Sequence, residues 1–237
     1  MQPVAAHGRL LRRRVRRWAP ASARSHNPAP QSAAGGGEPT IAEMSIPTRT
    51  EAAQILGALA APDWLARHSA AVAEVATFLA TAIDARGHAI HVPLVEAAAL
   101  LHDVDKALPA DHPLKHLGHG WAGAAWLREQ GHHELAGAVA NHPVTRLADD
   151  EHHSLWVGDA TIEERVVCYA DKRATQGVVS LEERFNRWID RHGDSAGIRA
   201  ARQRAEALER DVCAAAGIDP DDVQRIPWAT AGLGTRH

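Results

Sequence analysis

Apolar residues recur at spacings of three and four along most of the chain after Pro47. Between residues 64 and about 85, for example, Val72, Val75, Leu79 and Ile83 follow this spacing, which places them on one face of a helix. No run of alternating apolar and polar residues is convincing, and no hairpin dipeptide is flanked by β-branched residues. The pattern therefore predicts an all-α fold.

Prolines and glycines divide this pattern into consecutive helices. Pro93 fits the first turn of one helix, and Pro109 ends it. The predicted helices span residues 48–60, 64–85, 93–108, 117–130, 134–141, 160–176, 181–193 and 196–216. The polar stretch around His152 and His153 is predicted to be a solvated loop, with closure over a site as the alternative.

Residues 1–45 lack this periodicity. They contain the run Arg12-Arg13-Arg14-Val15-Arg16-Arg17, followed by sequence rich in Pro, Ser, Ala and Gly, a composition typical of disorder. We therefore predict a disordered basic tail over residues 1–45 and a single helical domain over residues 46–237. Four interpretations of the tail stay open: an inert segment, an arm that binds nucleic acid or membrane, an Arg-rich targeting peptide, and a stretch that precedes a true start at Met44.

Composition and charge narrow the class of protein. A chain of 237 residues with 45% hydrophobic residues can form one or two packed domains. Residues 1–43 hold seven Arg and two Glu, a net charge of +5, so the other 194 residues carry −8 of the total of −3. Such an acidic body argues against a broad nucleic-acid surface. No segment reaches the roughly 18 apolar residues of a membrane span, and two cysteines, Cys168 and Cys213, fit a reducing cytoplasm.

Candidate chemistry begins with histidine, the commonest metal ligand. The chain holds 16 His against two Phe and one Tyr. In the segment Leu100-Leu101-His102-Asp103-Val104-Asp105-Lys106, an apolar helix face runs directly into a His-Asp pair. A carboxylate there is unfavourable to bury unless it is paired or bound to a cation. Taken alone, the pair is explained more simply by a core histidine beside a capping aspartate.

Two distant residues favour a metal site. His68 lies 34 residues before His102, within the predicted helix 64–85, and Asp171 ends the apolar run 166–170, 68 residues after Asp103. Three helices would then each offer a ligand at the edge of an apolar stripe. Imidazole nitrogens combined with carboxylate oxygens suit Mn, Fe, Co, Ni or Zn better than Ca. We therefore expect these four residues to hold a divalent transition-metal ion.

The same residues resemble a known family. A His, then an apolar stretch that ends in His-Asp, then a distal Asp is the pattern of the HD-domain metal-dependent phosphohydrolases, and the resemblance covers about residues 50–190. The resemblance implies an HD-domain helical bundle. It also implies hydrolysis of a phosphate ester or anhydride by metal-activated water.

The motif layout is most similar to that of the bacterial HD-type hydrolases of dinucleoside tetraphosphates, which look like two-metal enzymes. That resemblance implies that Asp103 bridges two ions and that His119 and His142 hold the second. One ion is expected, and the second follows from the resemblance alone. Pro143 follows His142 where that subfamily usually has Thr, so the dinucleotide substrate is not carried over.

Charged neighbours of the ligands are candidates for binding substrate. Lys106 is at i+4 from His102 on the predicted helix face, so its ammonium should reach a substrate phosphate, and together with Asp103 it is the expected catalytic residue. Arg173 is the other candidate for substrate binding. For both Arg173 and its neighbour Lys172, the alternative is a side chain that is simply exposed to solvent. Asp105 is expected to be exposed, and the alternative is that it is an outer-shell partner of the metal ligands.

The predicted function is that of an enzyme acting on a small phosphorylated substrate, with a nucleotide as the leading candidate. Two alternatives stay open. One is a catalytically silent regulatory module that binds metal or nucleotide, against which the four intact ligands argue. The other is a di-iron HD-fold oxygenase, which would use the same ligand types. No sequence feature specifies an oligomeric state.

Overall fold

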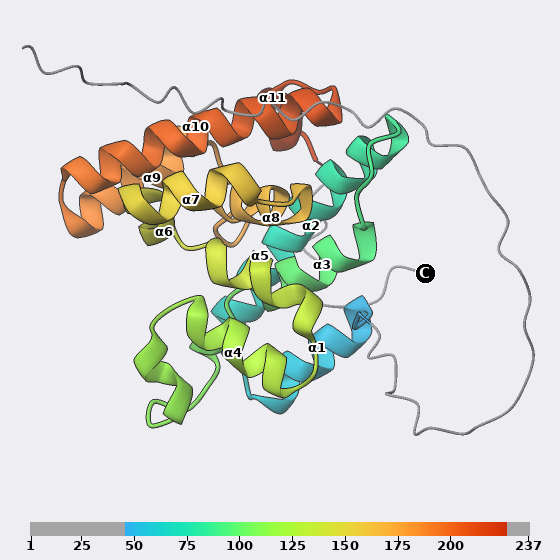
Figure 1. Cartoon of the computed structure of the whole chain (residues 1–237), viewed down its shortest axis with the longest axis vertical. Coiled ribbons are helices and arrows are strands. Elements are labelled where there is room, and N and C mark those ends of the chain that lie inside the picture. Colours follow the sequence, from blue (N-terminus) through green and yellow to red (C-terminus); the bar gives the residue numbers. More distant parts are fainter. Residues whose placement is uncertain (1–45, 227–237) are drawn as a thin grey trace, which may run out of the picture. The chain divides into compact units, whose positions relative to one another are not determined.

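Helices account for nearly all the regular structure of residues 46–226, the part of the chain that the computed structural model describes (Figure 1). Within this part the β-structure is limited to one isolated antiparallel bridge between Ala174 and Val178. The prediction of an all-α fold is therefore confirmed. The predicted disordered tail over residues 1–45 lies outside the described residues, as does the segment 227–237.

The helices follow one another with short connections. In chain order the α-helices are α1 (Arg49–Ala58), α2 (Asp63–Ala85), α3 (Val92–Leu101), α4 (Trp121–Glu129), α5 (Ala136–Asn141), α6 (Val144–Ala148), α7 (Asp150–Asp159), α8 (Ile162–Lys172), α9 (Leu181–His192), α10 (Ala196–Ala216) and α11 (Pro220–Gln224). Three short 3-10 helices lie between them: η1 (Val104–Lys106), η2 (Pro113–Leu117) and η3 (His133–Leu135). None of the described helices is long and apolar enough to cross a membrane.

The helix α2 lies at the centre of the described residues and packs against α3, α8 and α10. Its apolar positions Val72, Val75, Leu79 and Ile83 are fully buried, as their spacing predicts. Gly87 follows the helix with a positive φ of 79°, a conformation that glycine adopts without strain. The same buried surface carries His68 into the interior.

The helix α3 begins with a proline in its first turn, as predicted, but it ends at Leu101 rather than near residue 108. Both Leu100 and Leu101 are fully buried. The chain then tightens into η1, where backbone N–H groups reach back three residues instead of four. The His-Asp pair therefore lies at a bend directly after a buried helix.

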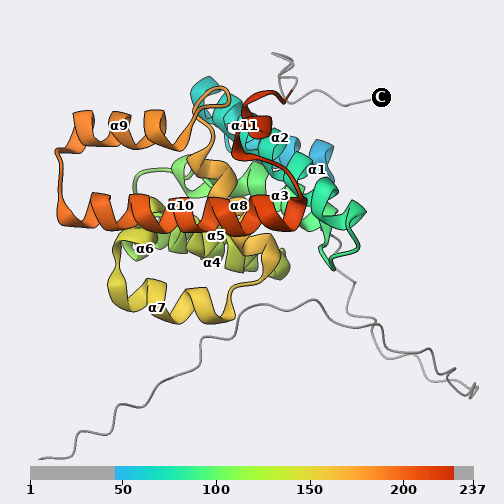
Figure 2. The ribbon, with the colours of Figure 1, turned by 90° about the horizontal axis from the view of Figure 1, so that it is seen from above.

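The C-terminal helices cover α8. Figure 2 shows α9 running alongside α10, and α10 also packs against α2, α6 and α8. The Ser195 side chain caps the start of α10, and Gly217 ends it in the left-handed conformation. Both helices have the bounds expected from the sequence to within one residue.

The structure contains short helices that the sequence pattern does not predict. The segments of α6, α7 and α11 were not expected to be helical. The prediction of a loop around His152 and His153 is wrong, because both residues lie in α7, whose first turn is capped by the Asp149 side chain. Within α7 only Trp156 is buried, so its apolar pattern is too weak to be recognised.

Candidate metal centre

Two histidines on neighbouring helices face each other. His68 lies in the second turn of α2, and His102 directly follows α3. The His68 Nδ1 is 2.7 Å from the carbonyl oxygen of Thr175, and the His102 Nδ1 is 2.7 Å from that of Ala99. A carbonyl oxygen only accepts, so each Nδ1 carries the proton and each Nε2 keeps a lone pair. These two Nε2 atoms are 3.2 Å apart.

A second pair of histidines repeats this arrangement. His119 precedes α4, and His142 follows α5. The His142 Nδ1 lies 2.7 Å from the carbonyl oxygen of Val139, while the His119 Nδ1 lies 3.0 Å from a carboxylate oxygen of Asp105. Their Nε2 atoms are 3.3 Å apart, and both again present a lone pair.

Asp103 lies between the two pairs. Its Oδ2 is 3.4 Å from the His102 Nε2 and 3.5 Å from the His68 Nε2. Its Oδ1 is 3.3 Å from the Nε2 atoms of both His119 and His142. Among the described residues this buried Oδ1 has no hydrogen-bond donor. One carboxylate thus joins two groups of potential ligands, which are His68–His102–Asp103 and Asp103–His119–His142.

Asp171 adds a second carboxylate to the first group. It lies at the end of α8, and its Oδ1 is 3.2 Å from the His68 Nε2 and 3.7 Å from the His102 Nε2. Its Oδ2 accepts a hydrogen bond from Lys172 Nζ at 2.8 Å. Residues from α2, α8 and the bend after α3, far apart in the sequence, therefore meet at one point.

This donor set fits divalent transition-metal ions. Lone pairs that face each other at 3.2 and 3.3 Å repel, and a buried carboxylate oxygen without a donor is unfavourable. A cation within each group would remove both penalties. His68, His102, Asp103 and Asp171 would hold one ion, and a second would share Asp103 with the other two histidines. Mixed imidazole and carboxylate ligands suit Mn, Fe, Co, Ni or Zn.

The pKa values favour the protonation states that bind metal. Burial raises the pKa of Asp103, but contacts with His102 and His142 outweigh it and hold that pKa well below its usual value. Burial also raises the pKa of Asp171, but the positive charge of Lys172 is the chief effect that outweighs it, so the pKa of Asp171 lies well below its usual value. Burial lowers the pKa of His142 to about 4. Near neutral pH both carboxylates are charged and His142 is neutral, as ligands must be.

Two residues after the His-Asp pair differ from expectation. Asp105 is not exposed but buried, because its carboxylate accepts the proton of the His119 Nδ1. Lys106 does not follow His102 on one helix face, because α3 ends before it and η1 turns the chain. This turn places Lys106 Nζ 2.7 Å from the Asp103 Oδ2, with 38% of the Lys106 side chain exposed.

Of the two possibilities for Lys172, the structure contradicts solvation. The side chain is fully buried, and its Nζ donates to the carbonyl oxygens of His142 and Cys168 as well as to Asp171. The charge therefore has three acceptors, which makes its burial tolerable. Lys172 also connects α8 to the segment that carries the His142 ligand.

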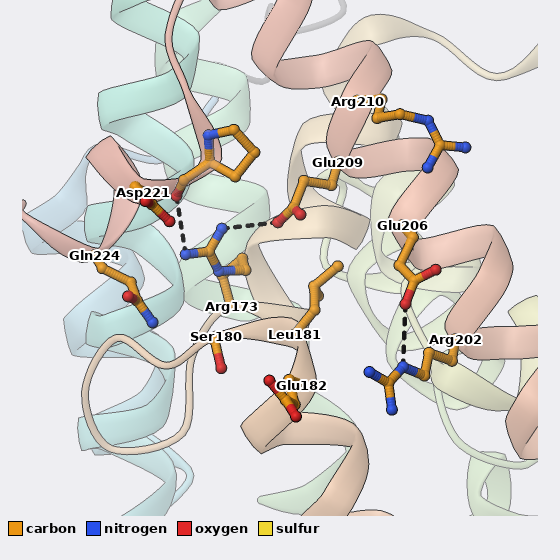
Figure 3. Close-up of a pocket in the computed structure, with 11 residues that line it drawn as sticks. Arg173, Ser180, Leu181, Glu182, Arg202, Glu206, Glu209, Arg210, Asp221 and Gln224 are labelled. Carbon is orange, nitrogen blue, oxygen red and sulfur yellow. Dashed lines mark hydrogen bonds and ion pairs between the residues drawn. The ribbon is translucent and has the colours of Figure 1, made fainter.

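Arg173 is buried too, and it turns away from the ligand groups. Its guanidinium donates to the Val179 carbonyl and to Glu209, both at 2.8 Å, and to the Tyr169 hydroxyl. Figure 3 shows it in a separate pocket of about 380 Å³ that is lined mostly by polar and charged side chains. Because acceptors outside the metal centre already bind this guanidinium, its position does not support the expected role in substrate binding.

Arg184 contacts the centre although no role follows for it from the sequence. It lies in the first turn of α9, and its Nη2 is 3.4 Å from the Asp171 Oδ1. The Ser180 side chain accepts a hydrogen bond from the backbone N–H of Glu183 and so caps the start of α9. This cap sets where α9 begins and hence where Arg184 points, but nothing in the sequence indicates contact with Asp171.

Comparison with known proteins agrees with this geometry. Residues 65–176 match the family model of the HD domain, a range that contains all six potential ligands. The chain is also 34% identical over 110 residues to the uncharacterized protein MJ0778 of Methanocaldococcus jannaschii. That match covers 44% of this chain and 62% of the relative, so the chain spans less than two thirds of the relative's length. No solved structure matches.

Proposed function

We propose that this chain hydrolyses a phosphate ester or anhydride, because residues 65–176 match the family model of the HD domain and the ligand pattern resembles that of the HD-domain metal-dependent phosphohydrolases. The expected substrate is a nucleotide or a similarly small phosphorylated metabolite. The observation that carries the proposal is the position of Asp103, whose two oxygens each face a pair of Nε2 lone pairs. An aspartate in this position suits a bridge between two divalent ions.

Divalent ions in such a centre supply a Lewis acid that lowers the pKa of water and polarises a phosphoryl oxygen. The protein's own part is to fix the ligands. Each histidine that donates its Nδ1 proton to a carbonyl or carboxylate has its ring orientation and tautomer set before an ion binds. Buried Lys172 keeps Asp171 ionised and oriented.

Lys106 is the group placed to meet the substrate. Its ammonium touches Asp103 and is partly exposed, so it can bind a phosphate oxygen without leaving the metal centre. His119, with 37% of its side chain exposed, marks the same accessible side. The ligands of the first group are buried. We expect the substrate phosphate to approach between these two exposed side chains.

The proposal is tested by a phosphate-release screen. The full chain, stripped of metal by a chelator, is assayed with nucleotides and dinucleoside polyphosphates after addition of Mn, Fe, Co, Ni or Mg. Phosphate release should depend on added metal. Asp103→Ala should abolish both metal binding and turnover while far-UV circular dichroism stays close to that of the parent. Turnover by this variant at the parent rate would overturn the mechanism.

The alternatives give different results in the same assays. Oxygen uptake without phosphate release would favour a di-iron oxygenase, and metal-dependent nucleotide binding without turnover would favour a silent regulatory module. The second ion is tested separately with His119→Ala and His142→Ala. Each variant should bind one ion fewer per chain, measured by elemental analysis. Unchanged metal content in both would reject the second site.

A further inference from the structure

Arg184 brings a cation to the metal centre from outside the matched HD-domain range. It lies on α9, beyond residue 176, and its Nη2 is 3.4 Å from the Asp171 Oδ1. The guanidinium carbon lies 4.5 Å from the centre of the Trp188 ring, one turn further along the same helix. This stacking restricts the position of the Arg184 side chain. Arg184 is therefore held near Asp171 even without a strong bond to it.

Asp171 does not need Arg184 for its own neutralisation. Its Oδ2 already accepts from the fully buried Lys172 at 2.8 Å. Bonds between a cationic N–H and a carboxylate are usually about 2.7–2.9 Å long, so the 3.4 Å contact of Arg184 is a weak one. In the described part of the chain, Asp171 is the one hydrogen-bond acceptor of the Arg184 guanidinium. The Nε of Arg184 has no acceptor there. The guanidinium thus retains donor capacity for another acceptor.

The charges of the centre indicate what that acceptor is. Three carboxylates and three cations lie in or against the ligand groups, and their formal charges cancel: Asp103, Asp105, Asp171, Lys106, Lys172 and Arg184. Each divalent ion would add two positive charges to this balance. A loaded centre is therefore positive and should attract an anion. Lys106 and Arg184 contact different carboxylates, Asp103 and Asp171, that share the His68 Nε2 as a neighbour.

We infer that Arg184 is a substrate-binding residue that, opposite Lys106, binds the oxygens of a phosphoryl group at the first ligand group. The inference rests on the proposed function for its substrate class. A guanidinium presents a planar fork of N–H donors that matches two oxygens of one phosphate, whereas an ammonium acts as a point charge. The two side chains would together hold the phosphoryl group from two sides.

Binding of inorganic phosphate to the Mn-loaded full chain tests this inference directly. In Arg184→Gln the Kd for phosphate, measured by calorimetry, should rise about 10-fold or more, as expected from loss of a hydrogen bond between charged groups. Arg184→Lys should lie between this variant and the parent, since it keeps the charge and loses the fork. Arg187→Gln is the matched control, because Arg187 is on the same helix, is largely exposed and bonds only to Glu183 in the described residues.

Manganese affinity separates substrate binding from a purely structural role. It should be similar in Arg184→Gln and in the parent. If manganese affinity falls while phosphate binds the metal-saturated variant as tightly as the parent, Arg184 only orients Asp171 and the inference is wrong. Failure of the proposed function would look different: no phosphate ester would be hydrolysed, yet phosphate affinity would still depend on Arg184.

Discussion

Asp105 illustrates how a residue outside both ligand groups can determine whether one of them binds metal. Its carboxylate accepts from the His119 Nδ1 at 3.0 Å, which leaves the Nε2 lone pair directed at Asp103. His119 is the most exposed of the four site histidines, and within residues 46–226 no backbone carbonyl accepts a hydrogen bond from its ring as in the other three. Its orientation therefore depends on this one side chain.

Replacing Asp105 by alanine should weaken the second ion selectively. Loss of such an outer partner usually lowers metal affinity 10- to 100-fold, and we expect a change of about this size for the ion at His119 and His142 only. Stepwise metal titration would measure both affinities. Asp111→Ala, an exposed aspartate of the following loop, is the control. Equal affinities for both ions in parent and variant would contradict the assigned role of Asp105.

The two cysteines should be inert in the folded protein. Burial raises the pKa of Cys168 to about 11, and the pKa of Cys213 is raised for the same reason. Because the thiolate is the reactive form and a raised pKa keeps the thiol protonated, neither should react with a disulfide reagent at pH 8. Both should react once guanidinium unfolds the chain. Rapid labelling of one thiol under native conditions would contradict the packing around it.

At the scale of elements, the turn before α4 joins the segments that carry His119 and His142. Gly120 has a positive φ of 82°, and a Cβ there would lie 2.7 Å from the Pro143 Cγ and 3.1 Å from the Ala140 carbonyl oxygen. Real Cβ atoms essentially never approach another atom to less than 3.0 Å, so the contact with Pro143 would force a shift. Glycine is therefore required for this approach as well as for the backbone conformation.

Gly120→Ala should consequently disturb the second ligand pair, whereas Gly118→Ala should not. Gly118 has nearly the same φ, 80°, but a Cβ there would meet nothing within 4 Å. Both variants bear a conformational penalty of about 1–3 kcal/mol, because each glycine has a backbone conformation that other residues rarely adopt, and only Gly120→Ala adds the collision with Pro143. The expected result is a larger loss of unfolding free energy and a loss of the second ion in Gly120→Ala alone. Equal behaviour of the two variants would show that the contact is easily relieved.

The sequence predicts the long helices well and the short ones poorly. Helices such as α2 and α10 bury one face along several turns, so their apolar spacing persists long enough to be read. Helices α6 and α11 have only five residues each, too few to show such a spacing. No local signal indicates where α3 ends, because the bend at His102 and Asp103 involves contacts with His68 of α2 and Asp171 of α8, which are distant in sequence.

The sequence likewise predicts some residues of the site, the metal ligands, and misses others, the partners that orient them. Residue type and order single out His68, His102, Asp103 and Asp171 as ligands because these side chains interrupt apolar stripes, and the structure brings them together. The partners that orient the ligands have no such signal. Burial of Asp105, the inward direction of Lys172 and the approach of Arg184 all result from packing between helices distant in sequence.

At the scale of the whole molecule, a largely buried network of hydrogen bonds and an ion pair holds the C-terminal helices against α8. Arg173, directly after α8, donates to Glu209 on α10 at 2.8 Å, and the hydroxyl of Tyr169 on α8 donates to the same carboxylate at 2.6 Å. Arg173 also reaches the Pro220 carbonyl at the start of α11. Because Asp171 lies in the last turn of α8, the network fixes the helix that carries a metal ligand. The pocket in Figure 3 is formed around these paired charges.

Neutralising Glu209 should therefore destabilise the molecule more than neutralising the neighbouring Glu206. Arg173 is 2% exposed, and removing one partner of a buried ion pair typically reduces unfolding free energy by about 3–5 kcal/mol. Glu206 bonds to the partly exposed Arg202 on the same helix, a pair for which less than about 1 kcal/mol is expected. Urea unfolding of Glu209→Gln and Glu206→Gln would measure both losses. Similar small losses in the two variants would mean that packing of α10, rather than the Arg173–Glu209 pair, holds the C-terminal helices on α8.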